Sequence, residues 1–177
     1  MGAPKAHLTL QGRPILEYLI DRWRWPGPTL LVTAPGRERP PGWGGFTREV
    51  SDPVAGAGPM RGVLTALEAV STELLVVTTC DMPGVGTEQF AWLIDLLSER
   101  DELLGLMARR GETVEPFPLA LRAAAIEVVR ERFDAGQRST YRHGELPRFA
   151  VEPAPAQLGE RVWVNLNTPD DLARFDV

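Results

Sequence analysis

The sequence predicts an α/β fold with a mainly parallel sheet and crossover helices. Short apolar runs of strand length alternate with segments in which apolar residues recur every three or four positions, the pattern of successive β-α-β units. The chain has 177 residues, of which 44% are hydrophobic, and this size suits a single hydrophobic core. We therefore expect one domain over residues 1–177.

The first half of the chain contains two predicted helices and two predicted strands. Residues 15–25 carry apolar side chains at helical spacing, and this helix is expected to end before Pro26. Residues 29–35 form a short, β-branched run bounded by prolines, which is typical of a buried strand, and residues 46–50 are a second candidate strand. Residues 63–72 show an apolar helical face after a loop of small residues.

The clearest element is the continuous apolar strand over residues 73–83, which stops at Cys80, Asp81, Met82 and Pro83. A helix over residues 87–100 follows, with Thr87 as its expected N-cap. The later predicted elements are strands over 103–111, 116–122, 148–155 and 162–167, and helices over 123–136 and 168–175, the last with Thr168 as N-cap and Pro169 at its first helical position.

Composition and charge argue against several classes of protein. The formal net charge is −5 and the arginines are scattered among acidic residues, so we expect no nucleic-acid partner. No apolar run is long enough to span a bilayer, so no membrane association is expected, and the charged, proline-bearing start is not a secretory signal. The single cysteine, Cys80, cannot form an internal disulfide, which favours a reducing cytoplasm.

Three polar positions follow predicted strands or precede helices and suit a charged ligand. Lys5 precedes the first helix, where it either neutralises phosphate or is simply solvated. Asp81 follows an apolar strand, where its carboxylate either pairs with a cation such as Mg²⁺ or only stabilises the turn after the strand. Asn165 and Asn167 are two residues apart at a predicted strand end, and the Asn167 amide either completes an Mg²⁺ shell or only starts the helix.

The remaining candidate residues give weaker indications of a functional site. Cys80 is expected to be a small buried hydrophobe, because no His or Asn constellation for a nucleophile accompanies it. His7 and His143 are isolated and lack metal-ligand spacing. Gly58 and Gly62 would let a ligand approach the backbone closely, as would the glycines of any tight loop.

Four short motifs stand in a fixed order along the chain. They comprise Met1, Gly2 and Lys5; then Gly58, Pro59 and Gly62; then Cys80, Asp81, Met82 and Pro83; and finally Asn165, Asn167, Thr168 and Pro169. In this order they resemble the signatures of the MobA-type molybdenum cofactor guanylyltransferases, within the nucleotidyltransferases of Rossmann-like fold. The resemblance runs from Met1 almost to Val177.

The resemblance implies a Rossmann-like three-layer sandwich that transfers GMP from GTP to the molybdopterin cofactor and releases pyrophosphate. It implies Lys5 and Asp81 as catalytic residues, and Asp81 and Asn167 as ligands of Mg²⁺. Lys5, Asp52, Gly58 and Asp81 would bind the nucleotide, and molybdoenzyme-maturation proteins would be further partners. The alternatives are a cytidylyl- or sugar-nucleotidyltransferase, and a catalytically silent homologue that acts as a binding partner in cofactor delivery.

The start of the sequence departs from the family pattern. The resemblance places a first strand and a glycine-rich phosphate loop before Met1, and their absence from this sequence makes the activity of the chain as given doubtful. The strands beside that first strand would each lack a hydrogen-bonded partner. Arg61 stands where the family usually has alanine, and it either supplies positive charge or is only solvated. We expect the 177-residue chain to bind GTP·Mg²⁺ more weakly, and to melt lower, than an extended chain.

Overall fold

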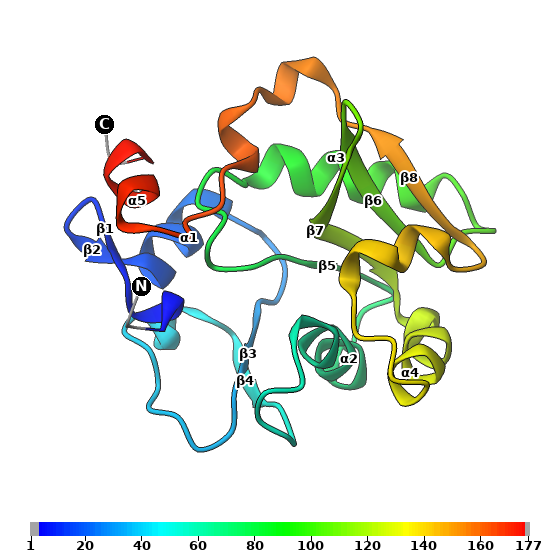
Figure 1. Ribbon diagram of the computed structural model, residues 1–177, viewed down its shortest axis with the longest axis horizontal. Helices are drawn as coiled ribbons and strands as arrows, with labels where there is room; N and C mark the ends of the chain where they lie inside the picture. Colours follow the sequence, from blue (N-terminus) through cyan, green and yellow to red (C-terminus); the bar gives the residue numbers. More distant parts are fainter. Residues whose placement is uncertain (1–3, 176–177) are drawn as a thin grey trace.

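A four-stranded sheet of order β5-β7-β6-β8 forms the centre of the larger part of the molecule, as a computed structural model that describes residues 4–175 shows (Figure 1). The strands are β1 Thr9–Leu10, β2 Arg13–Pro14, β3 Leu30–Thr33, β4 Arg48–Ser51, β5 Leu74–Val77, β6 Gly105–Arg110, β7 Thr113–Arg122 and β8 Phe149–Pro153. The α-helices are α1 Ile15–Trp23, α2 Pro59–Ala69, α3 Thr87–Ser98, α4 Ile126–Asp134 and α5 Pro169–Phe175.

Three of the four strands of this sheet run in the same direction. β6 pairs with β8 in parallel, and β5 and β6 each pair with β7 in the antiparallel sense, so β7 alone is reversed. A short turn at Gly111, where φ is +55°, joins β6 directly to β7 and explains the reversal, because a tight hairpin can connect only antiparallel strands. The predicted α/β class is confirmed, with one reversed strand inside the mainly parallel sheet.

The sheet is covered by helices on both faces, which gives the predicted three layers. Alternate residues of a strand point to opposite faces, so Leu106 of β6 joins the cluster formed with α3, whereas its neighbour Met107 joins the cluster formed with α2 and α4. Helices α2 and α4 pack against each other, and α3 packs on β5, β6 and β7. In Figure 1, α3 lies above β5 and the α2–α4 pair lies below it.

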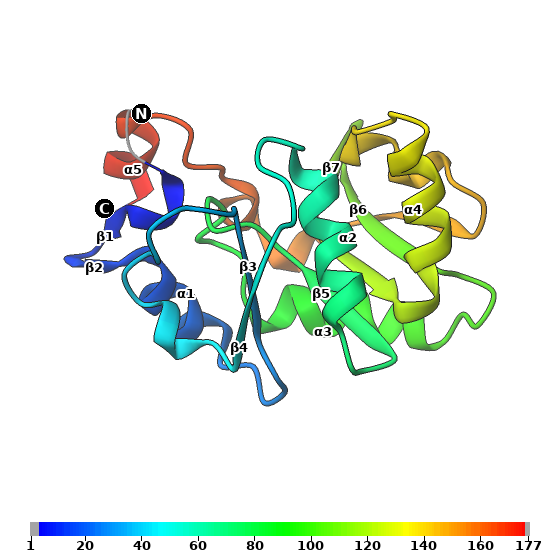
Figure 2. The ribbon, with the colours of Figure 1, turned by 90° about the horizontal axis from the view of Figure 1, so that it is seen from below.

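A separate parallel pair, β3 and β4, lies beside α2. Leu30 of β3 aligns with Arg48 of β4 and Thr33 with Ser51, and both strands contact α2. In both views this pair stands apart from β6, β7 and β8 (Figure 1 and Figure 2). Within residues 4–175, β3 and β4 pair only with each other, and β5 and β8 are the edge strands of the four-stranded sheet, so each of these four strands has one open edge.

Two predicted local features are wrong. Residues 162–167 do not form a strand, because Arg161–Trp163 is a single 3₁₀ turn and irregular backbone follows it. Val162 and Trp163 are buried from within this turn, so their apolar character reflects packing and not strand periodicity. Thr87 is not the N-cap of α3, because Gly86 holds that position and its N–H donates to the side chain of Gln89 at 2.7 Å.

Among the described residues, no helix is long and apolar enough to cross a membrane.

Candidate active site

Asp81 lies in the turn that follows β5, where the apolar strand leaves the core. Met82 and Val85 anchor this turn, with 2% and 0% of their surface exposed. Asp81 itself keeps 17% of its side chain exposed, so the carboxylate lies at the surface edge of the turn and not in the core. Burial of the flanking residues fixes the backbone here and leaves the carboxylate oxygens accessible to a cation.

The Lys5 ammonium bridges Asp81 and Asn167, which lie far apart in the sequence. Its Nζ donates to Oδ2 of Asp81 at 2.6 Å and to Oδ1 of Asn167 at 2.6 Å. Lys5 belongs to the 3₁₀ turn Lys5–His7, and its side chain is 38% exposed. Three of the predicted site residues, separated by as many as 162 positions, therefore meet around one nitrogen atom.

The second oxygen of Asp81 has its own partner. The Thr79 hydroxyl donates a short hydrogen bond to Oδ1 of Asp81, while Oδ2 accepts from Lys5. A carboxylate held at both oxygens has few rotamers left to it. Thr79 thus fixes the plane in which Asp81 presents its lone pairs.

Asn167 is brought to Asp81 by backbone contacts and not by a strand. The N–H of Leu166, which is fully buried, donates to the carbonyl of Asp81 at 2.7 Å. The N–H of Asn167 donates to Asn165 O at 3.1 Å and to Oδ2 of Asp171 at 3.0 Å. Asn165, which was expected to share a face with Asn167, contributes its carbonyl to this turn.

The two segments can approach because residue 84 has no side chain. A Cβ built on Gly84 would lie 2.4 Å from Arg161 O and 2.6 Å from Cα of Val162, inside the range that real contacts avoid. The carbonyl of Gly84 also accepts from Nε and Nη2 of Arg22, at 3.1 and 2.7 Å. This close packing sets the distance between the loop of Asp81 and the segment that leads to Asn167.

Asp52 and Gly58 make their contacts around α2. Asp52 follows β4, donates its N–H to Thr33 O at 2.7 Å, and accepts from the Thr65 hydroxyl at 2.6 Å. Gly58 stands at the N-cap of α2 with φ +79°, a conformation that favours glycine. Within the described part of the chain, neither residue hydrogen-bonds to Lys5 or Asp81. Met1 and Gly2 of the first motif lie outside the described residues.

Arg61 is buried and paired within the chain and is not solvated. It is 7% exposed, pairs with Glu68, and donates from Nε to the Thr65 hydroxyl at 3.0 Å. Since that hydroxyl in turn donates to Asp52, Arg61 orders Asp52 through Thr65. The alternative of a merely solvated Arg61 is therefore wrong, and the structure gives the residue a structural role.

The donor set at Lys5 fits a hard divalent cation. The ammonium already acts as a stand-in cation between a carboxylate oxygen and an amide oxygen, the ligand types that Mg²⁺ accepts. Among residues 4–175, no group of three or more His, Cys, Asp or Glu side chains could hold a metal. A site with so few protein ligands suits Mg²⁺, which keeps several waters and binds substrate phosphates.

The cysteine beside Asp81 is not a nucleophile. Burial raises the pKa of the Cys80 thiol to about 11, and the neighbouring Asp81 carboxylate contributes to this rise. A thiol with this pKa carries almost no thiolate at neutral pH. This agrees with the expectation that Cys80 is no nucleophile, although the residue is only partly buried and not fully buried.

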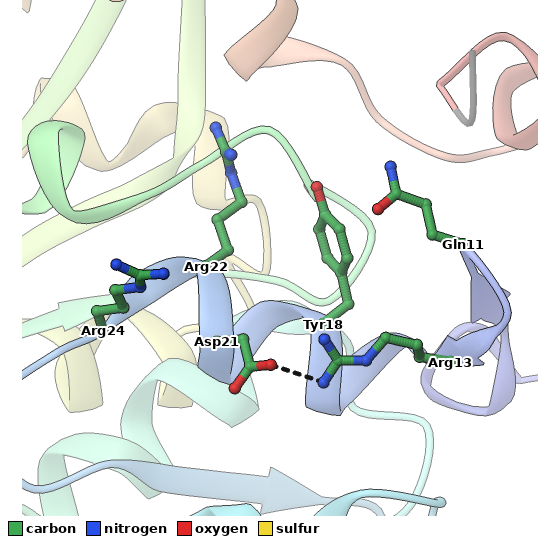
Figure 3. A pocket seen from close by; sticks show the side chains of 6 residues that line it. All are labelled: Gln11, Arg13, Tyr18, Asp21, Arg22 and Arg24. Carbon is green, nitrogen blue, oxygen red and sulfur yellow. Dashed lines mark ion pairs between the residues drawn. The ribbon is translucent and has the colours of Figure 1, made fainter.

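A separate open hollow of about 530 Å³ lies over α1 (Figure 3). Its lining consists of Gln11, Arg13, Tyr18, Asp21, Arg22 and Arg24, and contains none of the predicted site residues. Arg13 pairs with Asp21 at 2.7 Å, and Arg22 is engaged by Gly84 O. Two of the three guanidinium groups are thus already used within the chain, so the hollow is not an obvious anion site.

Three residues that support the site were missed by the sequence reasoning. Thr79 and Asp171 each hold one of the oxygen-bearing residues, and Gly84 allows their segments to meet. The signal for Asp171 was available, because an acidic residue three positions after an N-cap Thr is a capping-box pattern. Nothing in the local sequence indicates the tertiary contacts of Thr79 or Gly84.

Comparisons of the sequence with known proteins find a matching family and relatives. A family model described as "MobA-like NTP transferase domain" matches residues 1–149. Among curated proteins, the molybdenum cofactor guanylyltransferase of Shewanella pealeana (strain ATCC 700345 / ANG-SQ1) is 27% identical over 175 residues, covering 96% of this chain and 83% of its own.

Solved structures share the fold. Molybdopterin-guanine dinucleotide biosynthesis protein A from Archaeoglobus fulgidus matches with a TM-score of 0.79 and 21% identity, over 99% of this chain and 90% of its own. The 2-C-methyl-D-erythritol 4-phosphate cytidylyltransferase from Thermus thermophilus matches with a TM-score of 0.70 and 21% identity, over 98% of this chain and 92% of its own.

Proposed function

Because the chain belongs to the MobA-like NTP transferase family and is therefore a nucleotidyltransferase, we propose that it transfers GMP from GTP to the molybdopterin cofactor. The relatives named as molybdenum cofactor guanylyltransferases support this choice of substrates. The single cysteine is consistent with a reducing compartment, so we assign the reaction to the cytoplasm. Molybdoenzyme-maturation proteins would take up the product.

The proposed reaction is a single in-line displacement. An oxygen of the terminal phosphate of the pterin forms a bond to the α-phosphorus of GTP. The bond from that phosphorus to the oxygen bridging the β-phosphate breaks, and pyrophosphate leaves with the electron pair. No covalent enzyme intermediate is needed, so positioning and charge neutralisation supply the catalysis.

Each residue of the site has a role in this proposal. Asp81 and Asn167 would hold Mg²⁺, whose positive charge stabilises the phosphate oxygens when it is bound. Lys5 would neutralise further phosphate charge as its ammonium turns from the carboxylate to the nucleotide. Asp52 and Gly58, at the approach to α2, are proposed to contact the nucleotide.

One observation carries the proposal: Lys5 Nζ binds Asp81 Oδ2 and Asn167 Oδ1 at the same time. The Lys5 ammonium already occupies the point where these two oxygen atoms converge, beside the loop that follows the C-terminal end of β5. In open α/β sheets this edge is where ligands bind.

The test is transfer by the full chain with GTP, Mg²⁺ and molybdopterin cofactor, measured as formation of the guanine dinucleotide and of pyrophosphate. CTP and ATP in place of GTP address the alternative of a cytidylyl- or sugar-nucleotidyltransferase, which the fold shared with a cytidylyltransferase keeps open. Activity with CTP but not GTP would replace the proposed donor. Binding of molybdopterin without any transfer would support the catalytically silent homologue.

A further inference from the structure

We propose that Asp171 is a positioning residue for Asn167, and through it for the cation site at Asp81. This inference rests on the proposed function, because it concerns the same metal-binding pair. Asp171 touches neither the nucleotide nor the cation in this scheme. It acts by fixing the backbone from which the Asn167 side chain projects.

The contacts of Asp171 converge on the start of α5. One oxygen, Oδ2, accepts from the N–H of Asn167 at 3.0 Å and from the N–H of Thr168 at 2.8 Å. In return, the N–H of Asp171 donates to the Thr168 hydroxyl at 3.1 Å. The exchange between Thr168 and Asp171 is a capping box, whereas the bond to Asn167 lies one residue outside it.

The extra bond matters because Asn167 is exposed. A buried side chain is held by its neighbours, but an exposed amide has no packing to fix its direction. The backbone of residues 166 and 167 is held by Leu166 N–H on Asp81 O at 2.7 Å and by Asn167 N–H, which is shared between Asp171 Oδ2 at 3.0 Å and the carbonyl of Asn165 at 3.1 Å. Removing Asp171 leaves the Asn167 N–H with only its local bond to Asn165, so the Asn167 side chain can turn away from Lys5 and Asp81.

A purely structural role for Asp171, as a cap of α5, makes a different prediction. The structure supplies a matched control, since Thr168→Ala removes the hydroxyl half of the capping box and leaves Oδ2 of Asp171 free to hold Asn167. Both Thr168→Ala and Asp171→Ala should lower the melting temperature through loss of the cap. Asp171→Ala alone should loosen Asn167.

The first measurement uses electron paramagnetic resonance to quantify the binding of Mn²⁺ to the full chain in the presence of GTP. We expect Asp171→Ala to weaken Mn²⁺ binding about ten-fold, the size typical of residues that orient metal ligands, and Thr168→Ala to change it less than about two-fold. Asp171→Asn keeps an acceptor oxygen and should recover most of the affinity. Asp170→Ala, on the same helix turn, controls for loss of a negative charge.

The second measurement needs no metal. Hydrogen exchange of the Asn167 backbone amide, observed by NMR, should accelerate in Asp171→Ala and stay slow in Thr168→Ala. Equal effects of the two substitutions on this amide and on Mn²⁺ affinity would overturn the inference, as would an Asp171→Asn variant no better than Asp171→Ala. If the parent chain binds no Mn²⁺ with GTP, the proposed function fails, and the amide measurement still decides the role of Asp171.

Discussion

Lys5 and Asp81 form an ion pair of 2.6 Å between residues 76 positions apart, and the same ammonium also holds Asn167. A partly exposed ion pair adds little stability by itself. Its importance is that the lysine occupies the point a divalent cation would need, so lysine and cation compete for the same two oxygens.

Lys5→Met should therefore change metal and nucleotide binding in opposite directions. Without nucleotide, Mn²⁺ affinity should rise several-fold, because the competing ammonium is gone. GTP affinity should fall, because a phosphate-neutralising charge is lost. Calorimetry with each ligand alone checks both signs. Arg13→Met, which removes the exposed partner of Asp21, is the matched control and should change neither. Weaker Mn²⁺ binding by Lys5→Met would show that the lysine supports the cation.

Asp81→Asn should abolish most transfer while the protein stays folded. The loss of one charged metal ligand should lower turnover at least about a hundred-fold. The melting temperature should change little, because Lys5 is 38% exposed and can return to water. Asp21→Asn, at an exposed carboxylate that also pairs with a cation, should stay active. Turnover of Asp81→Asn within a few-fold of the parent would place the chemistry elsewhere.

Gly84→Ala should separate the loop of Asp81 from the segment before Asn167. The added Cβ would meet Arg161 O at 2.4 Å, and backbone atoms cannot yield as a flexible side chain does. We expect a loss of about 1–3 kcal/mol in unfolding free energy, measured by urea titration. Gly44→Ala, where a Cβ meets nothing within 4 Å, should be close to neutral. Equal stability of the two variants would mean that the loop moves apart without cost.

The stability of the protein should fall as the pH drops below about 6.5, because of His143. This ring is fully buried, and burial followed by the charge of Arg132 lowers its pKa to about 4. The unfolded state then binds a proton that the folded state excludes, so stability is complete above about pH 6.5 and is lost as the pH falls toward 4. Between pH 7 and pH 5 the loss should be about 2 kcal/mol in unfolding free energy.

His143→Phe tests this assignment. The phenyl ring has no titrating group and keeps an aromatic contact with Phe149, whose ring centroid lies 5.9 Å from that of His143. Urea unfolding at pH 7 and pH 5 should show a smaller difference in this variant than in the parent. His7→Gln serves as the control at the second histidine and should retain the parent's pH dependence.

The elements with strong apolar periodicity were predictable from the sequence. The helix at 15–25 and the strand at 73–83 appear as α1 and β5, with shorter bounds. The predicted strand at 162–167 failed because the apolar residues Val162 and Trp163 are buried from an irregular segment. Alternation of apolar residues in a window this short does not distinguish the two cases.

The candidate site was only partly predictable. Asp81 was singled out because a carboxylate after an apolar run is costly unless it is paired, whereas the metal role of Asn167 came from the family resemblance. Their shared contact with Lys5 depends on Gly84 packing against Arg161, an interaction between distant segments that no local pattern records. The alternative of a solvated Arg61 failed for a local reason, because α2 begins at Pro59 and not at residue 63, so Arg61 lies on the helix and contacts Thr65 and Glu68.

The open edges of β3 and β5 have a consequence for how the protein behaves at high concentration. Both strands are four residues long and half-buried, and neither Leu30–Thr33 nor Leu74–Val77 contains a lysine, a proline or an acidic residue to discourage pairing with another chain. The net charge of −5 repels copies at long range but does not protect a backbone edge at contact. The amide and carbonyl groups left unpaired along these two edges, and not the surface charge, would then set the solubility limit of the purified protein.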